Sequence, residues 1–449
     1  MGKLFGTDGI RGTVNQYPMT AATAVKVGEA IARIFAKKGH VPRIVIGRDT
    51  RVSGDMLEGA LVSGICSMGA QAVTVGVLPT PAVAYLTKDL RADAGIVISA
   101  SHNPWTDNGI KIFNGSGFKL SDDQENRIEA YLLSSEKGGR AAAAAQAGKL
   151  LRLDDAAGRY VDFLKSTFPR RLNPEGMKIV LDCANGATYR VAPEVFLELG
   201  VEAAALFDKP DGKNINLDCG SQHPEALAEE VLKRKADAGF AFDGDGDRVI
   251  AVDEKGHVLT GDRLLAVCAA VLKKEGKLKN NLVVRTVMSN LGLTVAFQKL
   301  GIDSVFTGVG DRFVLEEMLA RGAILGGEDS GHLIFLEHHT TGDGLITALQ
   351  ILAAMKKEDK PLSELAKIMK VFPQKLINID VSRKPALETV PEIASAVREA
   401  EKALGDKGRV LVRYSGTQNM CRVMVEGPTQ KETEFHCRRI ADVVKKALA

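Results

Sequence analysis

Three aspartates at alternate positions form the clearest chemical signal in the chain, in Asp243-Gly-Asp-Gly-Asp-Arg248. Carboxylates spaced in this way within a turn can face one point, and the intervening glycines permit the unusual φ angles that this requires. Because three adjacent carboxylates repel and raise one another's pKa values, a hard divalent cation would stabilise them. Mg²⁺ is the expected cation where phosphate is also present. We therefore expect Asp243, Asp245 and Asp247 to bind one Mg²⁺.

Two other interpretations of this segment are a solvated acidic turn and a calcium-binding EF-hand loop. In an EF-hand, Glu254 would stand at the twelfth position. The EF-hand is disfavoured because Arg248 replaces the glycine needed at the sixth position. The flanking segments 240–242 and 249–252 are also typical of strands.

A serine stands beside a histidine in Ser99-Ala-Ser-His-Asn-Pro104. Ser, Asn and Pro are common turn residues, so a plain turn explains the segment without any chemistry. A Ser-His hydrolase is disfavoured because adjacent side chains rarely point together and no G-x-S-x-G elbow surrounds Ser101. The third interpretation is a serine that carries a phosphoryl group, whose charge and hard oxygens suit the expected metal ion.

Cationic side chains are expected around such a site. Three aspartates, one Mg²⁺ and one phosphoserine sum to a charge of about −3, and phosphoryl transfer depends on electrostatic stabilisation. Candidates are Arg248, Lys111, and Arg11 in a Gly-flanked segment. Arg248 ends segment 243–248, which we call the metal loop. Each alone is typical of a surface charge, but together they predict a clamp. His102, next to Ser101, is a further catalytic candidate.

Two more polar loops offer ligand-binding groups. Arg413-Tyr-Ser-Gly-Thr-Gln418 follows a predicted strand and supplies a guanidinium, hydroxyls and backbone N–H groups, which bind phosphate. Arg422 in the next strand either adds a second charge or is an exposed strand residue. Gly327-Glu-Asp-Ser-Gly-His332 supplies acceptors and hydroxyls of the kind that bind sugar hydroxyls or an amine.

The elements that carry these loops repeat three times. Each copy has a β-rich run, a helical stretch, a second β-run, and a third β-run that ends in a polar loop. Apolar strands separated by helices predict parallel α/β units, and ligands bind beyond the carboxyl ends of such strands, so the three loops could converge on one cleft. The alternative is one large doubly wound sheet. The predicted strands are 43–47, 72–76, 95–99, 178–182, 202–206, 239–243, 282–285, 303–307 and 322–326.

Beyond about residue 370 the pattern indicates a small α+β domain. Its predicted strands are 375–381, 409–413 and 421–425, and its predicted helices are 392–404 and 430–448. Segment 138–148 is interpreted as a surface helix or connector. The expected domains are 1–150 with the serine loop, 151–254 with the metal loop, 255–369 with the sugar loop, and 370–449 with the phosphate loop.

Composition excludes several classes of protein. Lys and Arg number 59 against 56 Asp and Glu in 449 residues, a net charge of +3 that does not favour a nucleic-acid or membrane binder. No apolar run approaches the ~20 residues of a membrane span, and no secretory signal pattern is present. The 6 cysteines are scattered without a C-x-x-C pair, which argues against disulfides and zinc and predicts a reducing cytoplasm.

Taken together, these segments resemble the α-D-phosphohexomutase superfamily over essentially the whole chain. The resemblance implies three similar α/β domains with mixed, mostly parallel sheets, and a smaller C-terminal α+β domain, around a central cleft. The matching segments are Phe5–Gly12, Thr80–Tyr85, Ile98–Pro104, Asp182–Thr188, Asp243–Arg248, Gly326–His332 and Thr340–Gly344.

The resemblance also implies a role for individual residues. Ser101 would be the phosphorylated serine and would bind Mg²⁺ together with the three aspartates. Lys111 and Arg11 would lie near the reacting hydroxyl, with Lys111 as an acid/base candidate. The candidate substrate-binding residues are Glu328 and Ser330 for the sugar, and Arg413, Ser415, Gly416, Thr417 and Arg422 for the non-reacting phosphate.

The implied reaction is the reversible conversion of glucosamine 6-phosphate to glucosamine 1-phosphate through a 1,6-bisphosphate, for UDP-N-acetylglucosamine and peptidoglycan precursors. The expected partners are these small molecules, not nucleic acid or membrane, and the expected state is a monomer or homodimer. The alternatives are a phosphoglucomutase or phosphomannomutase, and a non-catalytic sugar-phosphate sensor. Asp329 stands where members usually carry Gln or Met, and its carboxylate would favour the ammonium of glucosamine if it points inward.

Overall fold

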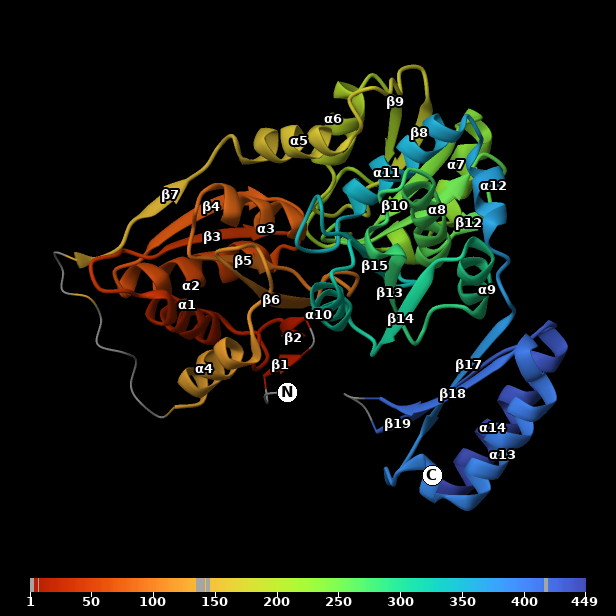
Figure 1. Cartoon of the computed structure of the whole chain (residues 1–449). Helices are drawn as coiled ribbons and strands as arrows, with labels where there is room; N and C mark the ends of the chain where they lie inside the picture. Colours follow the sequence, from red (N-terminus) through yellow and green to blue (C-terminus); the bar gives the residue numbers. More distant parts are fainter. Residues whose placement is uncertain (1–3, 7, 135–141, 143–145, 416–418) are drawn as a thin grey trace. The chain divides into compact units, whose positions relative to one another are not determined.

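The chain forms four separate β-sheets in a computed structural model that describes residues 4–6, 8–134, 142, 146–415 and 419–449 (Figure 1). The alternative of one large doubly wound sheet is therefore wrong. Three sheets are mixed α/β sheets, and the fourth is the antiparallel sheet of a small C-terminal α+β domain, as the sequence predicted.

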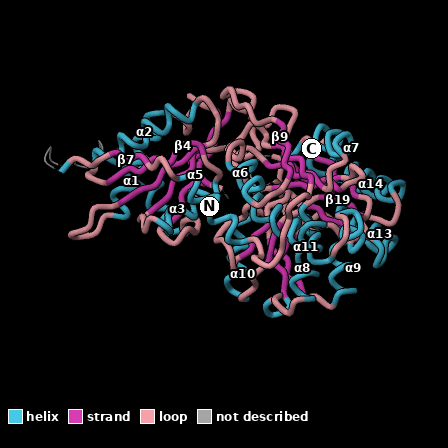
Figure 2. Tube along the Cα trace, turned by 90° about the horizontal axis from the view of Figure 1, so that it is seen from above, coloured by secondary structure: helices cyan, strands magenta, loops and turns pink. Residues whose placement is uncertain are grey.

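The first sheet has seven strands in the order β1-β2-β6-β5-β3-β4-β7. Alternate residues of its strands face opposite sides, as the period of a strand requires. Ile44 and Ile46 of β3 belong to the core that α1, α2 and α4 cover, whereas a Cβ at Gly47 would meet Val83 of α3 on the other face. Figure 2 shows α2 and α3 on opposite sides of these strands. The strands are β1 (Phe5–Gly6), β2 (Gly9–Thr13), β3 (Arg43–Arg48), β4 (Gln71–Val77), β5 (Ala94–Ile98), β6 (Asp107–Asn114) and β7 (Leu150–Arg152), and the helices are α1 (Ala21–Phe35), α2 (Ser53–Ser67), α3 (Thr80–Asp89) and α4 (Asp122–Leu133).

The second and third sheets repeat the centre of the first. Each has three parallel strands in the order second, first, third, followed by a strand that returns antiparallel beside the third. The second sheet and its helices are β8 (Lys178–Asp182), β9 (Glu202–Leu206), β10 (Ala238–Phe242), β11 (Val249–Asp253), β12 (Val258–Leu259), α5 (Ala156–Thr167), α6 (Val191–Glu198) and α7 (Glu225–Arg234). The third has β13 (Leu282–Thr286), β14 (Asp303–Thr307), β15 (Leu325–Gly327), β16 (Leu333–Phe335), α8 (Gly261–Lys274), α10 (Asp311–Arg321), α11 (Gly344–Glu358) and α12 (Leu362–Leu365).

The returning strand makes each chemistry-bearing loop a hairpin connection. The loops after β5, β10 and β15 lead into β6, β11 and β16. Strand β15 begins at Leu325 rather than at the predicted residue 322, because Gly322 adopts a left-handed φ of 66° and caps α10. The threefold repeat read from the sequence is confirmed, and its loops are shorter and more constrained than crossover loops.

The C-terminal sheet has the order β17-β19-β18 and packs against two long helices. A compact unit formed by residues 288–301 and 368–449 contains this domain and also α9, which lies between two strands of the third sheet in sequence. The buried Glu426 carboxylate accepts hydrogen bonds from the Leu291 N–H and the Asn290 side chain, both 3.1 Å. These elements are α9 (Leu291–Leu300), β17 (Gln374–Asp380), α13 (Pro391–Leu404), β18 (Arg409–Tyr414), β19 (Met420–Glu426) and α14 (Gln430–Leu448).

Two remaining segments bear on the expected organisation. Strand β7 (Leu150–Arg152) pairs with β4, so the first sheet reaches past residue 150. Most of segment 138–148, interpreted as a helix or connector, lies outside the described residues. In the described part of the chain, the helices are all too short or too polar to cross a membrane.

Candidate active site

Ser101 lies in the hairpin loop between β5 and β6 and is fully buried. Its backbone has a left-handed φ of 53°. Its hydroxyl donates a hydrogen bond of 2.6 Å to Asp243 Oδ2 and lies 3.3 Å from His102 Nδ1. The serine loop of the first sheet and the aspartate loop of the second sheet therefore meet at the atom proposed to carry phosphate.

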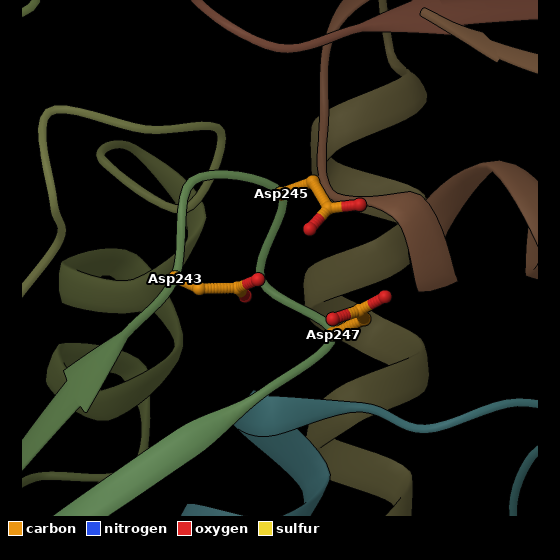
Figure 3. Close-up of side chains that lie close together, drawn as sticks. All are labelled: Asp243, Asp245 and Asp247. Carbon is orange, nitrogen blue, oxygen red and sulfur yellow. The ribbon is translucent and has the colours of Figure 1, made fainter. Parts of the chain in front are cut away.

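The three aspartates occupy the hairpin loop between β10 and β11, and Figure 3 shows their carboxyl groups on one side of it. One oxygen from each lies within 4.8 Å of the others, and the residues are at most 4% exposed. Burial, followed by repulsion from Asp247 and Asp245, raises the pKa of Asp243 well above its usual value. A solvated acidic turn is therefore wrong. The EF-hand is wrong as well, because Glu254 follows a strand and accepts a hydrogen bond from the Ser363 N–H.

The chemistry of these aspartates fits a divalent cation. Asp245 Oδ1 is buried and accepts no hydrogen bond from any described residue. Asp247 Oδ1 is also buried, and it lies 3.7 Å from both Arg248 and His332. Leaving buried carboxylate oxygens without partners is costly unless a cation satisfies them. Asp243, Asp245 and Asp247, which we call the triad, can thus hold a hard metal ion with oxygen ligands.

The two glycines of this loop act in different ways. Gly246 has a left-handed φ of 72°, as the sequence predicted. The prediction was wrong for Gly244, whose φ is not left-handed in the structure. A Cβ there would lie 2.6 Å from the Ser101 carbonyl oxygen, so Gly244 is needed for the close approach of the two loops.

Lys111 is a buried residue on β6, and its ammonium contacts three carboxylates. Its Nζ lies 2.7 Å from Asp245, 3.2 Å from Asp247 and 2.9 Å from Asp8. Burial alone would lower the pKa of Lys111, but these carboxylates raise it well above its usual value. Lys111 therefore stays protonated next to the triad. Arg11 pairs with Asp8, which links it to the same cluster.

His102 and Arg248 lie side by side at the serine. Arg248 Nη1 is 3.2 Å from His102 Nδ1. Burial, together with the nearby Arg248 and Arg11, lowers the pKa of His102 to about 4. The imidazole is therefore neutral at pH 7 and provides hydrogen bonds rather than charge. Arg248 keeps its charge, because Asp247 and Asp243 raise its pKa although burial opposes this.

Six side chains form a closed circuit of contacts that passes through Asp247 of the triad, and we call it the charge ring. The sequence singled out Lys111 and Asp247 but missed the other four. Lys119 Nζ lies 2.6 Å from both Asp8 and Asp311, and His332 lies 3.5 Å from Asp311 and 3.7 Å from Asp247. The ring runs through Lys111, Asp8, Lys119, Asp311, His332 and Asp247.

The sugar-loop candidates lie next to the metal loop. Glu328 is buried, and its Oε1 accepts a 3.0 Å hydrogen bond from the Gly310 N–H. Gly331 accepts a backbone hydrogen bond from Val249, which begins β11. The three loops therefore converge, as expected. Ser330 is exposed. Asp329 faces the N-terminus of α8, where its carboxylate lies 3.4 Å from the Asp262 N–H, so its part in ammonium recognition has no support.

The phosphate-loop candidates lie in the C-terminal unit. Arg413 and Arg422 face each other across β18 and β19. Burial and repulsion by Arg422 lower the pKa of Arg413, so the pair favours an anion. Ser415 is buried and accepts a 3.1 Å hydrogen bond from Lys384 at its carbonyl oxygen. Gly416 and Thr417 lie outside the described residues.

Comparisons with known proteins agree with this arrangement. Residues 2–138, 158–256, 260–372 and 376–443 match, in order, domains I, II, III and the C-terminal domain of phosphoglucomutase/phosphomannomutase. The chain belongs to this family. The superfamily resemblance read from the sequence is thereby confirmed.

Individual relatives match the chain over its whole length. A phosphoglucosamine mutase from Syntrophus aciditrophicus is 66% identical over 448 residues, covering 100% of both chains. A Burkholderia thailandensis phosphoglucomutase/phosphomannomutase family protein has the same fold, with a TM-score of 0.81, 24% identity and 98% and 97% coverage. Aspergillus fumigatus N-acetylphosphoglucosamine mutase, solved with GlcNAc-6P and magnesium, gives a TM-score of 0.66 at 18% identity, covering 95% and 99%.

Proposed function

We propose that the protein interconverts glucosamine 6-phosphate and glucosamine 1-phosphate. The observation that supports this proposal best is the 2.6 Å hydrogen bond from the buried Ser101 hydroxyl to Asp243. This hydrogen bond supports a role for Ser101 as the nucleophile, beside carboxylates that fit a divalent cation. The sugar is inferred from relatives, since the Syntrophus aciditrophicus protein is a phosphoglucosamine mutase over the full length of the chain.

In the proposed reaction, phosphorylated Ser101 gives its phosphoryl group to the O1 hydroxyl of the sugar 6-phosphate. The P–Oγ bond breaks as the P–O1 bond forms, the O1 hydroxyl loses a proton, and Ser101 Oγ gains one. The product is a 1,6-bisphosphate. After it turns over, the P–O6 bond breaks as a new P–Oγ bond forms. Ser101 Oγ loses its proton and O6 gains one, which leaves glucosamine 1-phosphate and phosphorylated Ser101.

Each site residue has a proposed part in this scheme. Asp243, Asp245 and Asp247 would hold Mg²⁺ with Ser101, and the ion would supply positive charge to the phosphoryl oxygens. Arg248, Arg11 and Lys111 add cationic charge at the same place, and the high pKa of Lys111 keeps a proton on Nζ. Glu328 and Ser330 would bind the sugar, and Arg413, Ser415, Gly416, Thr417 and Arg422 the other phosphate.

Three further points stand as part of the proposal. The domain boundaries after residues 150, 254 and 369 remain a proposal, with β7 counted in the first sheet although it extends to Arg152, and the proposed state is a monomer or homodimer. The six cysteines, all among the described residues, are free thiols, which supports a reducing cytoplasm.

Turnover of glucosamine, glucose and mannose 6-phosphates with Mg²⁺ tests the proposal. We expect glucosamine 6-phosphate to have the highest kcat/KM. A preference for glucose or mannose would favour the alternative mutase. Failure to isomerise any of them, with a folded protein primed by glucose 1,6-bisphosphate, would favour the sugar-phosphate sensor.

Ser101→Ala is expected to abolish turnover by more than a hundredfold while the protein stays folded, because it removes the covalent step. Ser116→Ala, in an exposed turn of the same domain, is the control and should retain full activity. Peptide mass spectrometry after incubation with glucose 1,6-bisphosphate should find phosphate on Ser101. Near-normal rates in Ser101→Ala would exclude it as the nucleophile.

A further inference from the structure

The main chain of Ser101 is held in a conformation that a serine rarely adopts. Its φ of 53° is left-handed, a conformation that is unfavourable for an L residue. Such a backbone persists only where its surroundings fix it. The Ser101 N–H donates a 3.0 Å hydrogen bond to Ser99 Oγ, and its carbonyl oxygen accepts from two side chains. Those two donors come from different sheets.

The first donor is Arg51, which follows β3 and is fully buried. Its Nη2 donates to the carbonyl oxygens of Ser101, at 3.2 Å, and of Asn103, at 2.6 Å. Its other terminal nitrogen pairs with Asp49, which accepts from Ser99 Oγ at 2.5 Å. Arg51 thus holds the serine loop from within the first domain.

The second donor is Asn216, in the loop after β9 of the second domain. Its Nδ2 donates to the same two carbonyl oxygens, at 2.9 Å for Ser101 and 3.2 Å for Asn103. A Cβ at Gly244 would lie 2.7 Å from this nitrogen. The amide therefore lies between the serine loop and the metal loop and touches both.

We infer that Asn216, acting with Arg51, is a positioning residue for phosphoryl transfer. The nucleophile belongs to the first domain and the aspartates to the second, so their separation depends on how the two loops are joined. Asn216 supplies a hydrogen-bonded join at the residue that reacts. A displacement of about 1 Å in a reacting group can cost on the order of a hundredfold in rate. This inference rests on the proposed function.

Two substitutions and a matched control test this role. Asn216→Asp keeps the side-chain shape but cannot donate to carbonyls, and Asn216→Gly removes the side chain, adds no charge and tolerates the left-handed φ of 58°. Asn214→Asp is the control, because Asn214 Nδ2 donates 3.0 Å to the Lys209 carbonyl in the same loop and contacts neither Ser101 nor Asn103 through any hydrogen bond of the described residues.

The readouts are steady-state kinetics and amide hydrogen exchange of the full-length protein. Both Asn216 variants are expected to lower kcat tenfold or more, to leave KM for glucosamine 6-phosphate within about twofold, and to speed exchange in peptide 99–106. Asn214→Asp should do none of these. A pure loss of folding would instead speed exchange throughout the chain.

Each remaining outcome is decisive. Unchanged exchange in peptide 99–106 overturns the inference, because Asn216 would then not fix the loop. Faster exchange with kcat within twofold of wild type also overturns it, because the contact would be structural only. If the wild-type protein turns over no hexose phosphate, the proposed function fails, and the exchange experiment still decides whether Asn216 holds Ser101.

Discussion

At the scale of single residues, the site depends on carboxylates and cations that set one another's ionisation. Asp8 is an example. Burial would raise its pKa, but Lys111, Lys119 and Arg11 hold it well below its usual value. Asp243 shows the opposite, since burial, followed by repulsion from Asp247 and Asp245, raises its pKa well above the usual value. Negative charge is therefore concentrated at the triad, and cationic side chains lie next to it. This arrangement suits a bound cation.

Asp245→Asn should weaken Mg²⁺ binding at least tenfold and lower kcat, because it removes one of the three anionic ligands. Calorimetric titration of Mg²⁺ and the Mg²⁺ dependence of turnover measure this. Asp237→Asn, an exposed aspartate of the same domain, is the control and should bind Mg²⁺ as wild type does. An unchanged Mg²⁺ titration in Asp245→Asn would contradict the metal assignment.

Gly244→Ala should lower kcat about a hundredfold, since the new Cβ would lie 2.6 Å from the Ser101 carbonyl oxygen and force the loops apart. Gly59→Ala is a matched control on α2, where nothing lies within 4 Å of the new Cβ. That variant should keep its activity and raise the melting temperature, because alanine favours a helix interior by up to about 1 kcal/mol. Equal activity of the two variants would contradict the steric account of Gly244.

The site residues that the sequence singled out and the structure brings together carry their chemistry in one short segment. Ser101 and the three aspartates are of this kind. Asp8, Lys119 and His332 were missed because their partners lie far away in sequence and only the fold unites them. Arg51 and Asn216 were missed too, although both follow the carboxyl ends of strands, the same rule that located the other loops.

At the scale of elements, the hairpins and helix termini hold the loops in place. Asp343 caps α11 next to the metal loop. Its Oδ1 accepts from the Leu345 and Ile346 N–H groups at 2.9 and 3.0 Å, and its Oδ2 accepts from the Tyr160 hydroxyl at 2.7 Å. The Gly344 N–H donates to the Gly246 carbonyl oxygen at 3.0 Å, which ties the start of this helix to the aspartate loop.

The cap gives stability a pH dependence of known sign. Burial raises the pKa of Asp343 from 3.8 to about 6, although its hydrogen bonds oppose this. The folded state therefore binds the Asp343 proton more tightly than the unfolded state. The stabilisation that this proton gives to the folded state is lost as pH rises through about 6. Asn is also a good N-cap but does not titrate. The free energy of unfolding of Asp343→Asn, relative to that of the wild type, should therefore rise by about 1–2 kcal/mol from pH 5 to pH 8.

Thermal unfolding of both proteins across this pH range measures the difference. Asp182, whose pKa burial also raises to about 6, is present in both proteins and cancels. Parallel curves of melting temperature against pH would contradict the prediction.

The strands that the sequence predicted coincide closely with strands of the structure, and the predicted helix 430–448 coincides with α14. Strands β2, β6 and β16 were not predicted. The order and direction in which the strands pair could not be predicted from hydrophobic periodicity. The returning antiparallel strands β6, β11 and β16 depend on contacts between segments, and short apolar runs do not reveal their direction.

At the scale of the whole molecule, the charge ring joins three sheets. Asp8, Lys111 and Lys119 belong to the first, Asp247 to the second, and Asp311 and His332 to the third. Since these charges are largely removed from water, salt screens them weakly. Breaking such a pair leaves a charge without compensation, which commonly costs about 3–5 kcal/mol.

Lys119→Met should lower the melting temperature by several degrees, because it removes the ammonium that Asp8 and Asp311 share. Lys111 and Arg11 still pair with Asp8, and His332 with Asp311. Lys165→Met is the control. Lys165 also bridges two carboxylates, Asp162 and Glu198, but at the surface, where ion pairs contribute little. Equal melting temperatures of the two variants, measured by calorimetry, would contradict a stabilising role of the ring.

The placement of α9 has a practical consequence for anyone dissecting this protein. Its helix is encoded in the middle of the third sheet but is grouped with the carboxyl-terminal body. A truncation after Lys367 would remove the Glu426 carboxylate, which accepts hydrogen bonds from the Leu291 N–H and the Asn290 side-chain amide. No single cut can remove the last domain cleanly, because a chain shortened in this way would keep α9 without the compact unit to which it belongs.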